Sequence, residues 1–85
     1  MKQFNIFFTK QAKKDVKLLD ERSKAKLQKI LLQTLSENPY LGKKLLGELR
    51  GNYSFRLSIK DRVIYSIDSK KRIIYIKRAR THYGD

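Results

Sequence analysis

The stretch at residues 53–68, YSFRLSIKDRVIYSID, decides the fold. Each of its halves alternates apolar and polar side chains, which is the pattern of a β-strand that buries one face. In the first half, Phe55 and Leu57 point to one side and Arg56 points to the other. Residues 59–61 are then left as a three-residue loop, a length that hairpins use. The stretch predicts an antiparallel hairpin with one apolar face and one basic face.

The register of this hairpin follows from the requirement that its apolar face stay whole. Residues directly opposite one another in an antiparallel pair lie on the same face, and a slip of one residue would set apolar side chains against polar ones. The predicted pairs are Leu57 with Val63, Phe55 with Tyr65 and Tyr53 with Ile67. This register brings Arg56 and Arg62 together on the other face.

The next strand is expected at residues 72–78, RIIYIKR, and is expected to pair with the second strand of the hairpin. The predicted partners are Ile67 with Ile73 and Tyr65 with Tyr75. This register sends Arg78 and Arg80 to the basic face of the hairpin. Strand pairing is expected to hold the chain up to about Arg80, and so to position His82 and Tyr83 at the edge of the arginine cluster.

The segments before the hairpin predict two helices between two further strands. KQFNIFF at residues 2–8 and LLGELR at residues 45–50 are typical of strands. Residues 9–20, with Thr9 as N-cap, and residues 21–38 have apolar side chains at helical spacing. The apolar stripes of the two helices consist of Ala12, Val16, Leu19, Leu27, Ile30, Leu31, Thr34 and Leu35.

These elements predict an α+β fold, in which two antiparallel N-terminal helices pack on one face of a four- to five-stranded, mainly antiparallel sheet. A chain of 85 residues that is 40% hydrophobic suits one small domain, residues 1–85. The expected core consists of Tyr53, Phe55, Leu57, Val63, Tyr65, Ile67, Leu27, Leu31, Val16 and Leu19.

The composition limits the classes of function. The net charge of +13 exceeds what solubility requires of a small domain, so a polyanionic partner is expected, with nucleic acid as the leading one. A basic surface that only solvates the domain, or that binds an acidic protein, is the alternative. With no cysteine and a single histidine, no metal and no cofactor are expected. No signal peptide or membrane span is recognisable, so the cytoplasm is the expected compartment.

The arginines at positions 56, 62, 78 and 80 suit contacts with phosphate groups, because the planar guanidinium binds a phosphate through two hydrogen bonds. A histidine side chain ordinarily titrates near neutral pH, so His82 suits proton transfer, and Tyr83 suits stacking on an unpaired base. Such groups can cleave RNA without a metal if they stabilise the phosphorane and protonate the leaving oxygen. The alternatives are the ordinary arginines of an exposed sheet face and a surface histidine.

The segment NPYLGKKLLGELRGNYSFRLSIKDRVIYSID and the closing IIYIKRARTHYGD resemble the RelE/ParE toxin superfamily. Within it they are similar to the RelE and YoeB branch of ribosome-dependent mRNA interferases, over essentially the full chain. The resemblance implies a toxin of a type II toxin–antitoxin system that cuts mRNA in the ribosomal A site, leaving a 2′,3′-cyclic phosphate and a 5′-hydroxyl. The implied partners are an acidic antitoxin, within a hetero-oligomer, and the ribosome with its A-site mRNA.

The resemblance also implies roles for single residues. Arg62 matches the arginine that stabilises the phosphate in the transition state, and Arg80 matches a further phosphate-binding arginine. His82 matches a general acid, and Tyr83 matches a residue that orients or stacks the substrate. Four further residues are expected to contact RNA: Arg56, Arg78, Lys43 and Lys44.

The general base is where the chain departs from the family pattern. Ser54 stands where RelE-like members have a catalytic lysine, and Glu48 does not stand at quite the spacing of the YoeB-like base. Glu48 is taken as the candidate base because it is expected on a strand beside Arg56. The alternative is a solvated charge at a strand edge, or a salt-bridge partner of Arg50.

Two other functions remain open. A ParE-like toxin shares the fold but inhibits DNA gyrase, and the presence of Arg62, Arg80, His82 and Tyr83 counts against it. A non-catalytic RNA-binding module would need only the charge.

Overall fold

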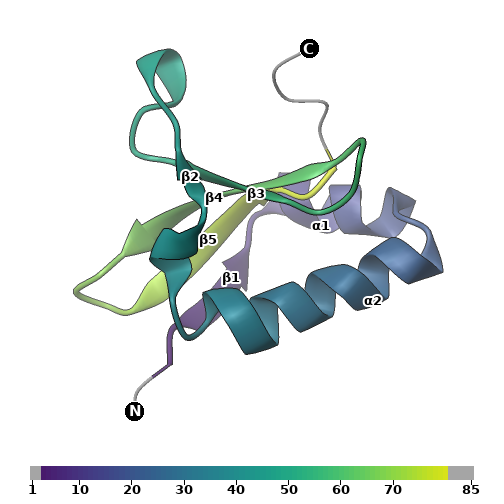
Figure 1. Cartoon of the computed structure of the whole chain (residues 1–85), viewed down its shortest axis with the longest axis horizontal. Coiled ribbons are helices and arrows are strands. Elements are labelled where there is room, and N and C mark those ends of the chain that lie inside the picture. The colour runs from purple at the N-terminus through teal and green to yellow at the C-terminus, as the bar shows by residue number, and fades with distance from the viewer. Residues whose placement is uncertain (1–2, 81–85) are drawn as a thin grey trace.

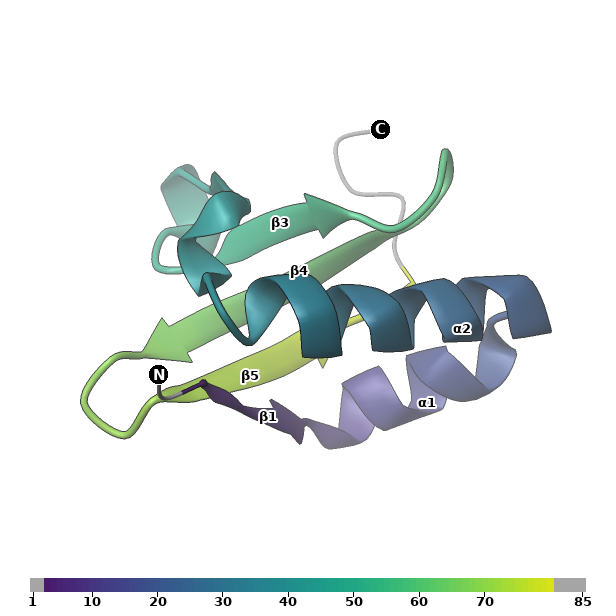
Figure 2. The ribbon, with the colours of Figure 1, turned by 60° about the horizontal axis from the view of Figure 1, so that its bottom comes forward.

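The computed structural model describes residues 3–80 and confirms the α+β fold. Two helices cover one face of a five-stranded sheet, and the other face carries none of the helices (Figures 1 and 2). In chain order the strands and α-helices are β1 (Asn5–Phe8), α1 (Lys10–Leu18), α2 (Glu21–Lys29), β2 (Lys43–Lys44), β3 (Tyr53–Arg56), β4 (Arg62–Asp68) and β5 (Ile73–Arg78). The strand order is β1-β5-β4-β3-β2, with β1 parallel to β5 and the other pairs antiparallel.

The first helix begins at the predicted N-cap, Thr9, and the second begins at a further N-cap, Asp20. The hydroxyl of Thr9 accepts the N–H of Ala12 at 3.2 Å, and the Asp20 carboxylate accepts the N–H of Ser23 at 2.7 Å. The second helix was expected to reach residue 38, whereas α2 ends at Lys29 and continues as a π-helix, Ile30–Leu35. None of the helices within residues 3–80 is long and apolar enough to cross a membrane.

The strand predicted at residues 45–50 is wrong. The chain forms only the two-residue β2 at Lys43–Lys44 and then a 3-10 turn, Gly47–Leu49. Gly47 and Gly51 have φ angles of +69° and +95°, which bend the chain out of the extended conformation at both ends of the turn. Leu45 is buried, whereas Leu46 is 81% exposed.

The β3–β4 register differs from the predicted one by two residues. Phe55 lies opposite Val63, and Arg56 lies opposite Arg62. The loop comprises residues 57–61 rather than three residues, because the Ser58 hydroxyl accepts the N–H groups of both Lys60 and Asp61 and stabilises a longer turn. A slip of two residues preserves the faces of the strands, so the predicted sharing of one face by Arg56 and Arg62 is confirmed.

The β4–β5 register differs by one residue, which reverses the face that β5 buries. Ile67 pairs with Ile74 and Tyr65 with Ile76, so Ile74 and Ile76 enter the core in place of Ile73 and Tyr75. A β-bulge then shifts the register between Ile64 and Tyr65, and Arg78 becomes the partner of Ile64. The bulge therefore returns Arg78 to the helix-free face.

All the residues predicted for the core lie there. Six of them are buried, and Val16, Tyr53, Phe55 and Ile67 are partly buried and pack against the others. The core also includes Phe4, Ala12, Ile30, Leu35, Ile74, Ile76 and Ala79.

Tyr65 fixes the loop before β2 to the middle of the sheet. Its fully buried hydroxyl donates to the Pro39 carbonyl at 2.7 Å and accepts the N–H of Gly42 at 3.1 Å. Burial raises the pKa of Tyr65 to about 12, despite the Gly42 hydrogen bond, which acts in the opposite direction. A Cβ atom at position 42 would overlap the Tyr65 hydroxyl and crowd the Ser54 carbonyl, so a larger residue there would force these groups to shift.

The substitution Tyr65→Phe is expected to lower the free energy of unfolding by about 1–3 kcal/mol, because it leaves a buried carbonyl and a buried N–H without a partner. Urea unfolding measures the change. Tyr40→Phe is the matched control, since Tyr40 is 53% exposed and its substitution should stay within about 0.5 kcal/mol of the wild type. Equal stability of the two variants would contradict this role of Tyr65.

Candidate functional site

The helix-free face of the sheet carries a cross-strand pair of arginines. Arg56 on β3 lies directly opposite Arg62 on β4; Arg56 is exposed and Arg62 is half-buried. The adjacent row on the same face consists of Lys43, Ser54, Ile64 and Arg78. The face therefore has the basic character that the sequence predicted, although it also contains apolar and hydroxyl side chains. We refer to Arg56, Arg62 and Lys43 as the arginine face.

Two like charges directly opposite one another in a sheet destabilise it. No carboxylate within residues 3–80 forms an ion pair with Arg56 or Arg62. An anion that binds between the two guanidinium groups would relieve this repulsion, and a phosphate accepts hydrogen bonds from both. The pair is thus electrostatically suited to a phosphodiester.

The two lysines of β2 face opposite sides of the sheet. Lys43 pairs with Ser54 and so lies on the arginine face, whereas Lys44 pairs with Tyr53 and faces the other way. Both side chains are exposed. The register thus gives Lys43, rather than Lys44, the position to contact a ligand bound at Arg56.

Glu48 is not on a strand beside Arg56, which corrects its predicted placement. It lies in the 3-10 turn Gly47–Leu49, its side chain is exposed, and the turn projects from the side of the sheet away from α1 and α2 (Figure 1). No ion pair between Glu48 and Arg50 is formed in the described part of the chain.

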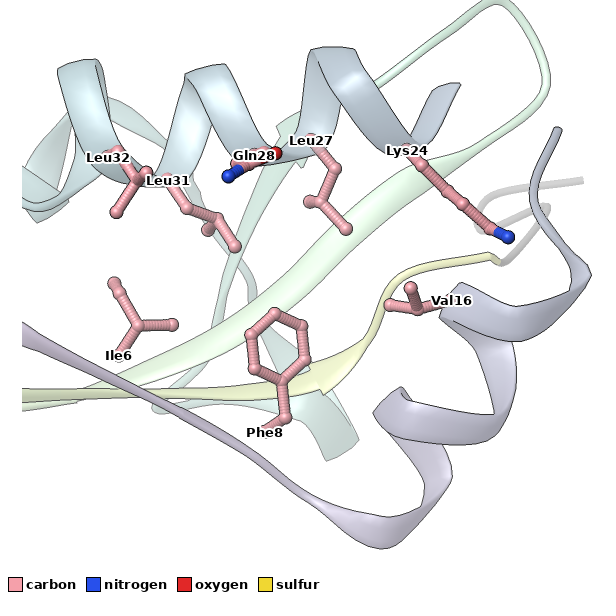
Figure 3. A pocket seen from close by; sticks show the side chains of 8 residues that line it. All are labelled: Ile6, Phe8, Val16, Lys24, Leu27, Gln28, Leu31 and Leu32. Atoms are coloured by element: carbon pink, nitrogen blue, oxygen red, sulfur yellow. The ribbon is translucent and has the colours of Figure 1, made fainter. Parts of the chain in front are cut away.

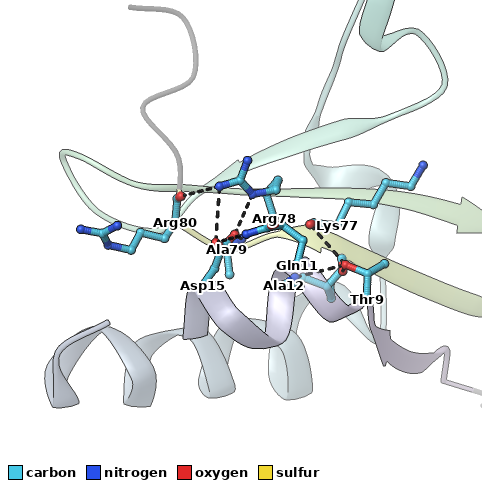
Figure 4. A network of polar contacts seen from close by, with 9 residues as sticks. Thr9, Gln11, Ala12, Asp15, Lys77, Arg78, Ala79 and Arg80 are labelled. Atoms are coloured by element: carbon cyan, nitrogen blue, oxygen red, sulfur yellow. Dashed lines mark hydrogen bonds and ion pairs between the residues drawn. The ribbon is translucent and has the colours of Figure 1, made fainter. Parts of the chain in front are cut away.

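Arg78 is engaged by a buried carboxylate on α1. Its Nε donates to Asp15 Oδ2 at 2.8 Å and its Nη2 donates to Asp15 Oδ1 at 3.4 Å (Figure 4). Asp15 also accepts the backbone N–H of Ala79 at 3.0 Å and the side-chain amide of Gln11 at 3.1 Å. The Asp15 side chain is only 4% exposed, whereas that of Arg78 is 43% exposed. Arg78 is thus held in an ion pair, and only the exposed part of its side chain is accessible to a ligand.

The pKa values of this pair shift as a favourable ion pair requires. Burial acts to raise the pKa of Asp15, but the hydrogen bonds from Arg78, Ala79 and Gln11 outweigh it and lower the pKa below its usual value. The hydrogen bond to Asp15 raises the pKa of Arg78. Both residues therefore carry full charge at neutral pH.

Asp15 is expected to make the protein sensitive to acid. A carboxyl group whose pKa is lower in the folded than in the unfolded state stabilises the fold above its unfolded pKa of about 3.9, and this stabilisation is lost as the pH falls through the folded pKa. Between about pH 5 and about pH 3, the free energy of unfolding should therefore fall less steeply for Asp15→Asn than for the wild type. Parallel curves from urea unfolding would contradict this expectation.

Asp15 was missed by the sequence analysis, although a signal was present. Ala12, Val16 and Leu19 form the apolar stripe of the first helix, and position 15 lies on the same stripe at helical spacing. A carboxylate on a buried stripe needs a positive or N–H partner. Arg78 and the Ala79 N–H supply these partners from the other end of the chain.

The end of β5 was predicted to be tied by strand pairing up to about Arg80. Pairing instead ends at Arg78, and Asp15 holds the following Ala79. Arg80 is exposed, and its carbonyl accepts a hydrogen bond of 3.4 Å from Arg78. His82 and Tyr83 lie outside the described residues, so their predicted positions remain expectations. Within residues 3–80, no three metal-ligating side chains lie together.

An apolar groove of about 360 Å³ lies on the opposite side of the sheet, between the helices and β1. Figure 3 shows Ile6 and Phe8 facing Leu27 and Leu31 across it. Val16 and Leu32 complete the apolar lining, and Lys24 and Gln28 add polar atoms at its rim.

A model of the family described as ParE-like toxin of type II bacterial toxin–antitoxin system matches residues 6–83. The chain belongs to this family. No curated protein sequence matches this ParE-like toxin significantly.

Solved structures agree with the family assignment. The toxin is similar to a chain of the RelBE2 toxin–antitoxin complex from Mycobacterium tuberculosis, with 31% identity and a TM-score of 0.86 over 100% of this chain and 97% of that chain. It is also similar to the YoeB dimer from Staphylococcus aureus, with 31% identity and a TM-score of 0.79 over 95% and 99%. A chain of the heterotetrameric YoeB–YefM complex from the same organism matches with 30% identity and a TM-score of 0.78 over 95% and 99%. The resemblance to RelE- and YoeB-like toxins is confirmed.

Proposed function

We propose that this ParE-like toxin is a metal-independent endoribonuclease that cuts mRNA in the A site of the ribosome. The observation that carries the proposal is the directly opposed pair Arg56 and Arg62 on the helix-free face, whose like charges favour the binding of an anion. The family resemblance of Arg62, Arg80, His82 and Tyr83 to the residues of RNA-cleaving members supports it. The functional unit is the single domain, residues 1–85.

In the proposed reaction the 2′-hydroxyl of one nucleotide attacks the adjacent phosphorus. A bond forms between O2′ and phosphorus, and the bond between phosphorus and O5′ breaks, which yields a 2′,3′-cyclic phosphate and a 5′-hydroxyl. Arg62, aided by Arg56, neutralises the negative charge that builds on the phosphorane. His82 donates a proton to the leaving O5′, and Tyr83 stacks on a base.

The proton of the 2′-hydroxyl needs an acceptor. We propose Glu48 for this role, since its turn projects from the helix-free side of the sheet and its carboxylate is exposed. Lys43, Arg80 and the exposed edge of Arg78 then bind neighbouring phosphates, and Lys44, which faces away, contacts ribosomal RNA.

The test is incubation of the purified toxin with a translated message, in parallel with the same message free of ribosomes. Primer extension should reveal cleavage at A-site codons only in the translated sample. Cleavage of both samples would contradict ribosome dependence. If the mRNA stays intact and the toxin abolishes supercoiling by gyrase, the toxin is a gyrase inhibitor instead. If the toxin binds RNA but has neither effect, it is a non-catalytic RNA-binding module.

We further infer that an acidic antitoxin neutralises the toxin in a hetero-oligomer. The relatives from M. tuberculosis and S. aureus form toxin–antitoxin complexes, and the charge of +13 suits an acidic partner. The apolar groove, with Lys24 at its rim, offers this partner a surface distinct from the arginine face.

Co-purification with the protein encoded next to the toxin tests this inference. An acidic protein that binds and blocks cleavage supports it, and a strongly basic one contradicts it. Leu32→Lys in the groove should weaken the complex about tenfold or more without changing cleavage by the free toxin. Leu18→Lys is the matched control, because Leu18 is also exposed but does not line the groove.

A further inference from the structure

Ala79, the residue that follows β5, is held by a helix and not by the sheet. The last cross-strand partner on β5 is Arg78, which pairs with Ile64. The next residue, Ala79, is fully buried and its N–H donates to Asp15 on α1 at 3.0 Å. The direction in which the chain leaves the sheet is therefore set at Asp15.

Both oxygens of the Asp15 carboxylate accept hydrogen bonds at the end of β5. One oxygen accepts from Arg78 Nε and from the Ala79 N–H, and the other accepts from Arg78 Nη2 and from Gln11. The same Nη2 also donates to the Arg80 carbonyl at 3.4 Å. The contacts thus fix, in series, the side chain of residue 78, the backbone of residue 79 and the carbonyl of residue 80 (Figure 4).

The helix that carries Asp15 is itself anchored to the same strand. The Thr9 N–H donates to the Ile76 carbonyl at 3.1 Å, and its hydroxyl lies within hydrogen-bond distance of the carbonyls of Ile76 and Lys77. Six residues later on α1, Asp15 contacts the strand end. Because both contacts join α1 to β5, the carboxylate has a defined position relative to the arginine face.

We infer that Asp15 is a positioning residue, which acts through Arg78 and Ala79 to set the course of the chain at Arg80. This inference rests on the proposed function, because Arg80, the residue that it positions, binds a phosphate group in the proposed reaction. A fold that needed only stability at this point could bury an apolar side chain on the α1 stripe. The buried carboxylate instead imposes a single geometry on a guanidinium and a backbone N–H.

The test compares Asp15→Asn with Arg78→Lys. The asparagine has one acceptor oxygen in place of two, and the lysine keeps the positive charge but cannot form the two-pronged contact. Both variants should slow single-turnover cleavage at saturating toxin by roughly 10- to 100-fold, since a displacement of about 1 Å costs that much. Ribosome affinity should change by less than about twofold, since it is spread over many cations.

Tyr65→Phe is the matched control for stability, because the hydrogen bonds that it removes join Tyr65 to Pro39 and Gly42 and do not involve Asp15, Arg78 or Ala79. It should cleave at the wild-type rate although it is destabilised. Hydrogen exchange of the Ala79 amide provides a readout that needs no activity and should be about tenfold faster or more in Asp15→Asn.

Three results would overturn the inference. They are wild-type single-turnover rates in both variants, unchanged exchange at Ala79, or an equal loss of rate in Tyr65→Phe. If the wild type itself fails to cleave translated mRNA, the proposed function fails and the inference fails with it. If the wild type does cleave translated mRNA and any of the three results above is found, only the positioning role of Asp15 is refuted.

Discussion

Arg62→Ala is expected to slow single-turnover cleavage of ribosome-bound mRNA by roughly 10²-fold or more, the usual effect of removing an electrostatic contact to the transition state. Affinity for the ribosome should change little, and the slope of its logarithm against the logarithm of salt concentration should fall by about one unit. Because Arg62 lies opposite Arg56, its removal also relieves a repulsion, so the variant should be at least as stable as the wild type.

Arg50→Ala is the matched control for Arg62→Ala. Arg50 is exposed and follows the 3-10 turn, outside the cross-strand pair, so its loss should reduce the salt dependence without slowing cleavage. Equal cleavage rates for the two variants would mean that the arginine face only binds RNA. A large loss of stability in Arg62→Ala would contradict the like-charge pairing.

His82→Ala is expected to have a comparable effect, a loss of roughly 10²-fold or more in the single-turnover rate, because the leaving O5′ would lack a proton donor. Ribosome affinity should again be nearly unchanged. The expected signature is a change in the pH–rate profile, since the limb that belongs to the histidine should disappear.

Two further variants separate the roles of the neighbouring residues. If His82→Ala cleaves at the wild-type rate while Tyr83→Ala does not, the segment acts as a stacking surface and the histidine has no part in proton transfer. If truncation after Arg80 leaves cleavage intact, no residue beyond position 80 is catalytic. Either result would mean that the general acid is another cationic side chain of this protein or a group of the ribosome.

The fold could be predicted because apolar periodicity and capping residues agree along most of the chain. Thr9 caps α1 as expected, and the residues predicted for the core lie there. The hairpin register was wrong by two residues, but faces repeat every second residue, so the prediction that Arg56 and Arg62 share a face survived. This central feature of the candidate site was therefore available from the sequence.

The wrong predictions concern segments whose hydrophobic pattern does not favour one structure over another. The segment from Ile73 to Ile76 is apolar on both faces, so alternation cannot say which face is buried, and alternation does not reveal the bulge beside Ile64. The segment with Glu48 was predicted to be a strand, but Gly47 within it and Gly51 just after it have positive φ angles. The ion pair of Asp15 and Arg78 joins residues 63 positions apart, and local patterns do not reveal such a contact.

The most direct test of the central claim is the chemistry of the ends that a single turnover leaves on programmed ribosomes. The mRNA carries one labelled A-site codon, and the toxin is added in excess. The proposed reaction predicts a 2′,3′-cyclic phosphate on the upstream fragment and a 5′-hydroxyl on the downstream fragment, so the downstream end should accept a phosphate from polynucleotide kinase without prior phosphatase treatment. A downstream fragment that carries a 5′-phosphate, with a free 3′-hydroxyl upstream, would contradict attack by the 2′-hydroxyl and with it the mechanism proposed for the arginine face.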